Sequence, residues 1–486
     1  MTQNAQKAFS LRALATLVLF LVLALVATSC IAGAALESPN QPDIVLILTD
    51  DMRADDIEHM PKTQSLIVDQ GLSFSNAFVT TSQCCPSRAS ILRGQYAHNH
   101  HVPHNRGPEG GFEKFRKLGH EESTVATWLD EAGYNTVLLG KYFVQYGAAA
   151  HIPPGWDEWY ARSLNANYYD YALSENGEPV YYGSSEQDYQ TDVLTRKATD
   201  FINRAADSSQ PLFMYLAPQA PHIPYQSASR HEDLFAEEKA PRPPSFNEAE
   251  VSDKPSKVNE LPSLSPDEEA NLDQVYRQRL RMLQAVDDMV EAVVGELEAV
   301  GRLENTYVFF TSDNGYLLGE HRIAETKGFG YEESIKVPLA VRGPGIPAGS
   351  TTDRIALNTD LAPTFADLAK ATTPDFVDGR SLRPVFASDT FFWRTAFLEE
   401  FFMGKQAYRA VRTTGGEKYV EYTRTGEREL YDRATDPYEL ENRYQTADAV
   451  SLEFLQLRLS TLVLRSRLSA LEDCAGETCR AAEDGL

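Results

Sequence analysis

Four stretches of continuous apolar residues recur along the chain, and each ends in polar or charged residues. They are DIVLILTDD (43–51), YNTVLLGK (134–141), PLFMYLAPQAPH (211–222) and NTYVFFTSDNG (305–315). Apolar runs of this length are typical of strands buried on both faces of a parallel sheet. Because ligands bind beyond the carboxyl ends of such strands, we expect the four polar ends to meet at one site.

Segments with helical periodicity precede three of these runs. STVATWLDEAG (123–133) ends in a glycine that suits a helix C-cap, and a second segment lies around residues 189–205. A longer helix, from about Leu272 to Val300, spaces its apolar residues at helical intervals. This alternation predicts an α/β fold with a mixed, mostly parallel central sheet flanked by helices.

Two regions depart from the alternation. Residues 226–270 are rich in Pro, Ser, Glu and Lys, so we expect a long surface excursion that is ordered only in part. Residues 407–432 alternate around glycine turns and predict a small antiparallel sheet, and residues 451–468 predict a terminal helix. The expected organisation is a main α/β domain over 43–385 and a C-terminal subdomain over 386–486.

The N-terminus is typical of an export signal, which we expect to cover residues 1–34. Lys7 and Arg12 precede an apolar run over residues 14–27, and small residues follow it. The run is short for a membrane-spanning helix and no basic flank follows, so we expect an exported protein. Cys30 lies where a lipidated cysteine would lie, which leaves a lipid-anchored form open beside a secreted or periplasmic one. We expect membrane contact only if Cys30 is lipidated.

The charge of the chain limits its partners. The 486 residues carry a formal net charge of -25, which argues against nucleic-acid binding. An anionic substrate would therefore need a local cationic pocket set against the field of the whole chain.

The cysteines raise a specific question. After export, Cys474 and Cys479 are close enough in sequence for a small tail disulfide, while Cys84 and Cys85 are adjacent. Adjacent cysteines rarely pair with each other because the geometry is strained. A free reactive thiol is also a liability in an oxidising compartment. The adjacent pair therefore needs another explanation.

Residues 84–88, CCPSR, fit the pattern C-x-P-S-R. With TDDMR, GKY, APH, SDNG and the Lys327 segment in the same order, the chain resembles the sulfatase family from Asp43 to about Glu441. It is most similar to the subgroup that contains N-acetylglucosamine-6-sulfatase and the extracellular heparan endosulfatases. The resemblance implies an alkaline-phosphatase-like fold. It also implies that a separate maturation enzyme oxidises Cys84 to formylglycine (3-oxoalanine), which leaves Cys85 as a buried spectator.

Oxygen ligands at two strand ends indicate a metal site. Asp50 and Asp51 end the first apolar run, and Asp313 and Asn314 end the fourth. Each pair alone could equally be a helix cap or a turn. Together they are ligands that suit Ca²⁺ or Mg²⁺. The resemblance favours Ca²⁺ and implies that the formylglycine at position 84 also faces the ion.

The resemblance assigns further roles to single residues. It implies that a hydroxyl of the hydrated aldehyde is the nucleophile and that Arg88, one helical turn after Cys84, holds it. It implies that Lys141 and Lys327 bind the sulfate and that His222 protonates the leaving alcohol. The alternatives are solvated lysines and a packed loop histidine.

One position departs from the pattern of many sulfatases, which have histidine two residues after the first lysine. Here that position is Phe143, a feature shared with the glucosamine-6-sulfatase-like subgroup. It leaves open which group activates the nucleophile. Among the neighbouring histidines we take His100 as the candidate and expect it to bind substrate.

The sequence thus predicts an exported, calcium-dependent sulfuric ester hydrolase. We expect it to act on a sulfated sugar, such as a 6-O-sulfated N-acetylglucosamine, or on an aryl sulfate. Two alternatives stay open. One is a phosphonate monoester or phosphodiester hydrolase of the same superfamily. The other is a non-catalytic sulfated-glycan-binding protein, which applies if Cys84 is never modified.

Overall fold

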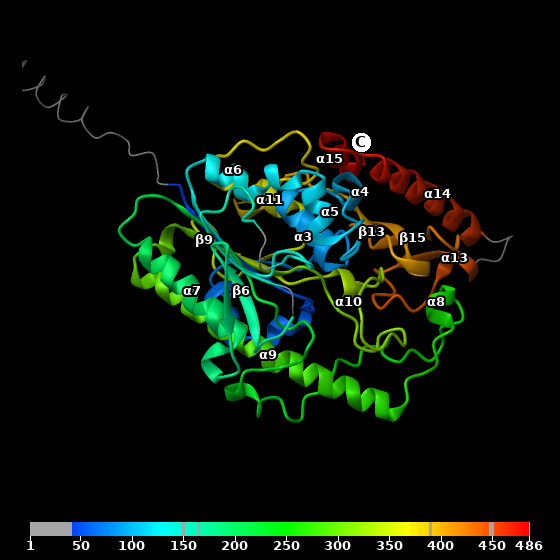
Figure 1. Ribbon diagram of the computed structural model, residues 1–486. Coiled ribbons are helices and arrows are strands. Elements are labelled where there is room, and N and C mark those ends of the chain that lie inside the picture. The colour runs from blue at the N-terminus through cyan, green and yellow to red at the C-terminus, as the bar shows by residue number, and fades with distance from the viewer. Residues whose placement is uncertain (1–40, 148–150, 164–165, 388–390, 447–451, 486) are drawn as a thin grey trace, which may run out of the picture. The chain divides into compact units, whose positions relative to one another are not determined.

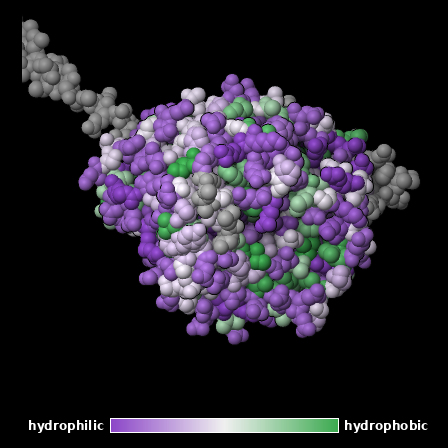
Figure 2. Space-filling model, in the orientation of Figure 1, coloured by the Kyte–Doolittle hydropathy of each residue, from purple (hydrophilic) through white to green (hydrophobic). Residues whose placement is uncertain are grey.

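The computed structural model describes residues 41–147, 151–163, 166–387, 391–446 and 452–485. The expected export signal, residues 1–34, lies outside this part. Residues from Pro42 onward belong to one compact unit. Within the described residues, no helix is both long and apolar enough to cross a membrane. The face seen in Figure 2 is mostly hydrophilic, as expected where charged residues make up 24% of the chain.

A ten-stranded sheet is the central element, and the four apolar runs form its inner strands (Figure 1). These four strands pair in parallel in the order β9-β1-β8-β4. Antiparallel pairs occur on both sides of them, which confirms the mixed, mostly parallel sheet. In sheet order the strands are β11 (Ser350–Thr352), β2 (Leu72–Phe74), β10 (Leu339–Arg342), β9 (Thr306–Ser312), β1 (Asp43–Thr49), β8 (Leu212–Ala217), β4 (Asn135–Gly140), β5 (Glu158–Arg162), β6 (Tyr171–Glu175) and β7 (Glu178–Tyr182). Strands β3 (Ala77–Phe78) and β12 (Ala356–Leu357) form a separate pair.

Helices cover both faces of this sheet (Figure 1). Strand β1 is apolar throughout because both of its faces are buried. Ile44, Leu46 and Leu48 lie in one core, and Val45 and Ile47 lie in the other. On the first face lie α3 (Cys84–Arg93), α5 (Gly111–Lys117), α6 (Val125–Glu131) and α11 (Leu361–Ala369). On the second lie α7 (Gln190–Arg204) and α9 (Pro266–Ala299). The remaining helices are α2 (Pro61–Thr63), α4 (Ala97–His100), α8 (Ser256–Asn259), α10 (Glu332–Ile335), α12 (Arg383–Ala387), α13 (Arg443–Thr446), α14 (Leu452–Glu472) and α15 (Glu477–Asp484).

The expectation of partial order over residues 226–270 is wrong. Val251 and Val258 from this segment are buried in a small apolar cluster with Leu317 and Tyr431. A segment that places apolar side chains in a core gains enough burial to offset the entropy of ordering it. Its few apolar residues are scattered among polar ones, which is why composition alone misjudged the segment.

Helix α9 also begins earlier than expected, at Pro266 rather than near Leu272. The Ser265 hydroxyl accepts a hydrogen bond from the Glu268 amide, and the Glu268 carboxylate accepts one from the Ser265 amide at 2.8 Å. This capping box, with proline at the first helical position, fixes the start of the helix.

The predicted C-terminal antiparallel sheet is confirmed, and its first strand lies before the predicted range of residues 407–432. Its strands are β13 (Ala396–Phe401), β14 (Tyr408–Thr413), β15 (Glu417–Tyr422) and β16 (Arg428–Asp432). Phe397 of β13 stacks on Phe78 with ring centroids 5.0 Å apart, which joins this sheet to the main core. The tail disulfide between Cys474 and Cys479 is present. The domain boundary at residues 385 and 386 stays a prediction.

Candidate active site

The polar ends of the inner strands meet, as the sequence predicts. Asp50 and Asp51 follow β1 and Asp313 follows β9, its parallel neighbour. One ligand atom from each of these residues and from Cys84 lies within 4.8 Å of all the others. All four residues are buried. Residues from three distant places in the sequence therefore form one cluster, which we call the carboxylate cluster.

Cys84 enters the carboxylate cluster from the first position of α3. Its Sγ lies 3.5 Å from Oδ1 of Asp50 and 3.9 Å from Oδ1 of Asp51. The N-terminal end of a helix favours negative charge on a group placed there. Even so, burial raises the pKa of the Cys84 thiol to about 12, although Lys141 and Lys327 oppose the shift. An unmodified thiol here is therefore protonated and a poor nucleophile.

Arg88 lies on the same face of α3, one turn after Cys84, and is fully buried. Its Nε donates to Oδ2 of Asp313 at 2.8 Å, and its Nη1 donates to the carbonyl of Lys141 at 2.6 Å. One guanidinium thus ties α3 to the ends of β9 and β4. The sequence prediction that Cys84 and Arg88 share a helical face is confirmed.

Two lysines complete the charge balance. The ammonium of Lys141 contacts Asp50, and that of Lys327 contacts Asp51 and lies 2.8 Å from Sγ of Cys84. Burial opposes ionisation of Asp50, but Lys141 holds the pKa of this carboxyl well below its usual range. Three cations face three carboxylates: Arg88, Lys141 and Lys327 against Asp50, Asp51 and Asp313.

Asn314 provides the clearest test of a metal site. Its Nδ2 donates to Oδ1 of Asp51 at 2.7 Å, whereas its buried Oδ1 has no hydrogen-bond partner within the described structure. Asp51 itself has a φ of 68°, a conformation that is strained for any residue with a side chain and that often marks functional sites. A hard cation would satisfy the amide oxygen of Asn314 together with the three carboxylates. These residues could hold one metal ion.

His222 reaches the same cluster from the loop after β8. Its Nε2 lies 3.8 Å from Oδ2 of Asp51, and its Nδ1 donates to the carbonyl of Ile223 at 2.5 Å. The hydroxyl of Tyr168 donates to the His222 carbonyl at 2.7 Å and holds the loop. Burial lowers the pKa of His222, while Asp50 and Asp51 oppose this shift. The ring is thus held with Nε2 toward the carboxylate cluster.

His100 does not join these residues. Its Nδ1 accepts a hydrogen bond from the Val102 amide at 3.1 Å, and its Nε2 lies 3.2 Å from the Ser90 hydroxyl. Both ring nitrogens are therefore used inside the protein, and these contacts give no support to a role in substrate binding. Phe143 is buried, with its ring centroid 4.7 Å from that of Phe115.

Arg279, which supports the carboxylate cluster from α9, was not among the residues predicted from the sequence. Its Nη2 donates to the backbone carbonyl of Asp51, and its guanidinium lies 4.4 Å from the centroid of the Tyr316 ring. It therefore helps to hold Asp51 in its strained conformation. A signal was available, because Arg279 sits midway between Val275 and Leu283 on an otherwise apolar helical stripe.

Comparison with protein families gives two matches. The family model described as Sulfatase matches residues 42–371, and one described as N-sulphoglucosamine sulphohydrolase, C-terminal, matches residues 319–464. The N-acetylglucosamine-6-sulfatase of Capra hircus is 34% identical over 499 residues, covering 93% of this chain and 86% of that protein. The extracellular sulfatase SULF-1 homolog of Drosophila melanogaster is 37% identical over 354 residues, covering 72% of this chain but only 32% of that protein.

Solved structures share the fold at lower identity. One is a protein in complex with its substrate D-glucosamine-2-N,6-O-disulfate, with a TM-score of 0.74, 24% identity and coverage of 91% of this chain and 99% of that chain. Another is the phosphonate monoester hydrolase of Agrobacterium radiobacter, with a TM-score of 0.67, 22% identity and coverage of 89% and 96%. At these identities the likeness shows the architecture alone.

Proposed function

Because the chain belongs to the sulfatase family and is a sulfuric ester hydrolase, we propose that it cleaves the 6-sulfate of an N-acetylglucosamine or a related sulfated sugar. The observation that carries the proposal is the buried cluster of three carboxylates around Cys84, with three cations facing it. The choice of sugar rests on the names of the mammalian relatives. An aryl sulfate is the simpler substrate that the same chemistry would accept.

In this proposal the nucleophile is a formylglycine made from Cys84, in its hydrated form. The raised pKa of the thiol supports this, because the unmodified side chain would carry no negative charge at neutral pH. Cys84 is only 1% exposed in the folded chain, so a maturation enzyme would have to act before folding is complete. Cys85 remains a buried thiol, in keeping with a spectator role.

The first chemical step transfers the sulfuryl group to the chain. A hydroxyl of the hydrated aldehyde at position 84 attacks sulfur, and the bond between sulfur and the sugar oxygen breaks. The proton of the attacking hydroxyl passes to the Asp50 carboxylate, whose Oδ1 lies 3.5 Å from Sγ of Cys84, and from there to solvent. Lys327 and Lys141 would bind the sulfate oxygens. Protonated His222 would donate to the departing sugar oxygen from Nε2, since Nδ1 is engaged with the Ile223 carbonyl.

The second step restores the chain. The remaining hydroxyl at position 84 loses its proton to the now neutral His222 and re-forms the carbonyl. The bond between the side-chain carbon and the sulfate oxygen breaks, and sulfate leaves. Water then hydrates the aldehyde again. A serine at this position could not follow this route because it has only one hydroxyl.

A bound cation belongs to the proposal. Asp50, Asp51, Asp313 and Asn314, with the side chain at position 84, would hold Ca²⁺, and Mg²⁺ is the second choice. When bound, the ion would stabilise negative charge on the sulfate oxygens and help to orient them. Arg88 would then hold both Asp313 and the hydroxyl at position 84.

We further propose that the protein is exported. The disulfide between Cys474 and Cys479 supports an oxidising compartment, and relatives of this chain are named extracellular sulfatases. The signal over residues 1–34 and lipidation at Cys30 remain predictions from the sequence.

The test is sulfate release from N-acetylglucosamine 6-sulfate by protein made in a host that forms formylglycine. We expect turnover that Cys84→Ala abolishes, and lower rates on 3-sulfated and 4-sulfated isomers. Rates on matched aryl sulfate, phosphonate and phosphodiester substrates distinguish a sulfatase from the alternative, a phosphonate monoester or phosphodiester hydrolase. A higher rate on the phosphonate or phosphodiester would replace the proposed function, and binding without turnover of any ester would leave a glycan-binding protein.

A further inference from the structure

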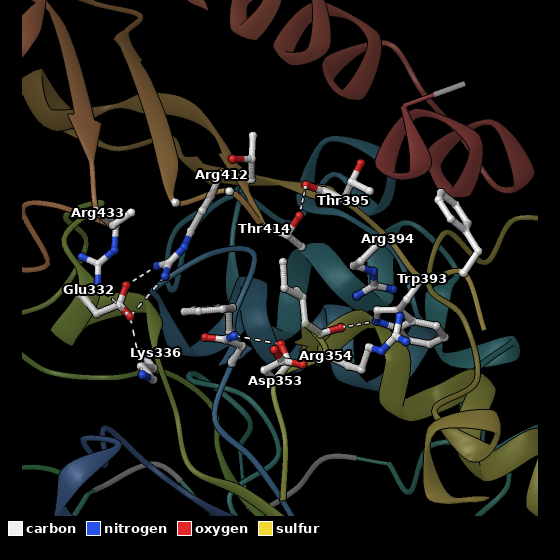
Figure 3. A pocket seen from close by; sticks show the side chains of 18 of the residues that line it. Glu332, Lys336, Asp353, Arg354, Trp393, Arg394, Thr395, Arg412, Thr414 and Arg433 are labelled. Atoms are coloured by element: carbon white, nitrogen blue, oxygen red, sulfur yellow. Dashed lines mark hydrogen bonds and ion pairs between the residues drawn. The ribbon is translucent and has the colours of Figure 1, made fainter. Parts of the chain in front are cut away.

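A cavity of about 790 Å³ lies outside the carboxylate cluster, where the chain after β11 meets the turn between β14 and β15 (Figure 3). None of the clustered active-site residues lines it. Five cationic side chains and two carboxylates do, and the cations are Lys336, Arg354, Arg394, Arg412 and Arg433. In a chain with a net charge of -25, such a local excess of positive charge is unusual.

One end of the cavity concentrates this charge around a single carboxylate, that of Glu332 (Figure 3). Arg412 pairs with it, Arg433 lies 3.2 Å from it and Lys336 lies 3.7 Å from it. Of these three, Arg433 also reaches a second carboxylate, Glu439, at 3.3 Å. Among the side chains that line this end of the cavity, three cations thus share the one carboxylate of Glu332, and Lys336 is the most loosely held of them at 3.7 Å.

Arg433 provides a second observation that points to a ligand. Its Nε is buried and has no hydrogen-bond partner among the described residues. Buried guanidinium donors are normally satisfied, because leaving one unpaired is costly. Arg433 lines the cavity, and a guanidinium is well suited to sulfate or carboxylate.

The opposite end adds a different chemistry. Arg354 lies 5.3 Å from the centroid of the Phe391 ring, and the neighbouring Phe392 is 65% exposed. Arg394 at this end is not available, because both of its terminal nitrogens bond Asp360 at 2.6 Å. An exposed aromatic ring beside a cation and threonine hydroxyls suits a sugar ring that carries an anionic group.

We propose that this cavity binds an anionic saccharide. Arg433, Lys336 and Arg354 would face its sulfate or carboxylate groups, and Phe392 would face a sugar ring. The anion part of the inference rests on the charges of the cavity, and the saccharide part rests on the proposed function. The site would hold a sulfated glycan beside, and not within, the carboxylate cluster.

The first experiment measures binding without turnover. In a Cys84→Ala background, isothermal titration at physiological salt uses a heparin-derived tetrasaccharide and its unsulfated counterpart. We expect two binding events for the sulfated ligand. The double substitution Lys336→Gln and Arg354→Gln should weaken one of them at least about tenfold, since each lost ionic contact costs roughly that factor when partly desolvated. The unsulfated ligand should bind weakly to every variant.

Matched variants guard against loss of the fold. Lys336→Arg with Arg354→Lys keeps both charges and should bind nearly as the parent does. Phe392→Ala removes an already exposed ring and should weaken the same event, whereas Tyr181→Ala, at a ring that is 80% exposed and outside the cavity lining, should not. A single binding event, or affinities in the double variant within twofold of the parent, would refute the cavity as a site.

A second readout separates this cavity from the catalytic site. With Cys84 intact and matured, the double variant should hydrolyse a small aryl sulfate with kcat/KM within twofold of the parent. A parallel fall in kcat/KM would mean that Lys336 and Arg354 act through the active site, which overturns the proposal. Absence of aryl sulfate hydrolysis in the parent would instead count against the proposed function, because the titration does not depend on turnover.

Discussion

Replacing Arg88 with methionine removes one of the three cations that face the three carboxylates, while keeping a side chain of similar length. The Nε of Arg88 lies 2.8 Å from Oδ2 of Asp313, and both side chains are fully buried. At an effective dielectric constant of about 20, Coulomb's law gives an attraction of about 6 kcal/mol at that separation. Breaking a buried pair by removing one partner typically costs about 3–5 kcal/mol of stability, and we expect a loss in that range.

Urea denaturation in the presence of a chelator measures this loss. Saturating Ca²⁺ should reduce it, because a cation bound to the carboxylates would replace part of the missing positive charge. Arg93→Met is the matched control, since Arg93 is on the same helix but donates to Gln95 and to the carbonyls of His120 and Ser123. A loss below about 1 kcal/mol for Arg88→Met, or one equal to that of Arg93→Met, would refute the electrostatic reasoning.

Three further outcomes follow from the structure. Chelation should abolish hydrolysis and lower the thermal midpoint, and Ca²⁺ should restore both better than an equal concentration of Mg²⁺; unchanged activity in chelator would contradict the metal site. Burial raises the pKa of Glu399 from 4.5 to about 7, although Lys418 opposes this shift. The contribution of protonated Glu399 to the stability of the folded state is therefore complete below pH 4.5 and is lost as pH rises through about 7. Between pH 5 and 8 the parent should therefore lose up to about 3 kcal/mol more stability than Glu399→Gln, as measured by urea denaturation midpoints. Identical pH profiles for the two proteins would contradict this. Replacing Cys474 and Cys479 by alanine should cost about 2 kcal/mol for a loop this short, and no change in the thermal midpoint would contradict it.

The strand-end part of the site could be predicted from the sequence because its physics is local and general. Continuous apolar runs form parallel strands, and parallel strands end on the same side of a sheet. These two rules were enough to predict that Asp50, Asp51 and Asp313 lie close together. Arg88 also followed from simple spacing, since one turn of α3 separates it from Cys84.

Other parts depend on tertiary contacts that no local pattern encodes. The sequence gives no reason why Asn314 should have one satisfied and one unsatisfied polar atom, because this depends on the position of Asp51. His100 ends helix α4 and His222 lies in the loop after β8, and no local pattern distinguishes them, yet only His222 faces the carboxylate cluster. The cavity around Arg433 joins six separate segments of the chain, so it could not be anticipated from spacing.

The measurement that tests the account most directly is mass spectrometry of the tryptic peptide 63–88, made from protein expressed in its own host and assayed for sulfate release in the same sample. The account predicts an aldehyde in place of the Cys84 thiol, in a fraction of molecules that rises and falls with specific activity. Full activity in a sample whose Cys84 is entirely an unmodified thiol would contradict the proposed nucleophile and the mechanism built on it.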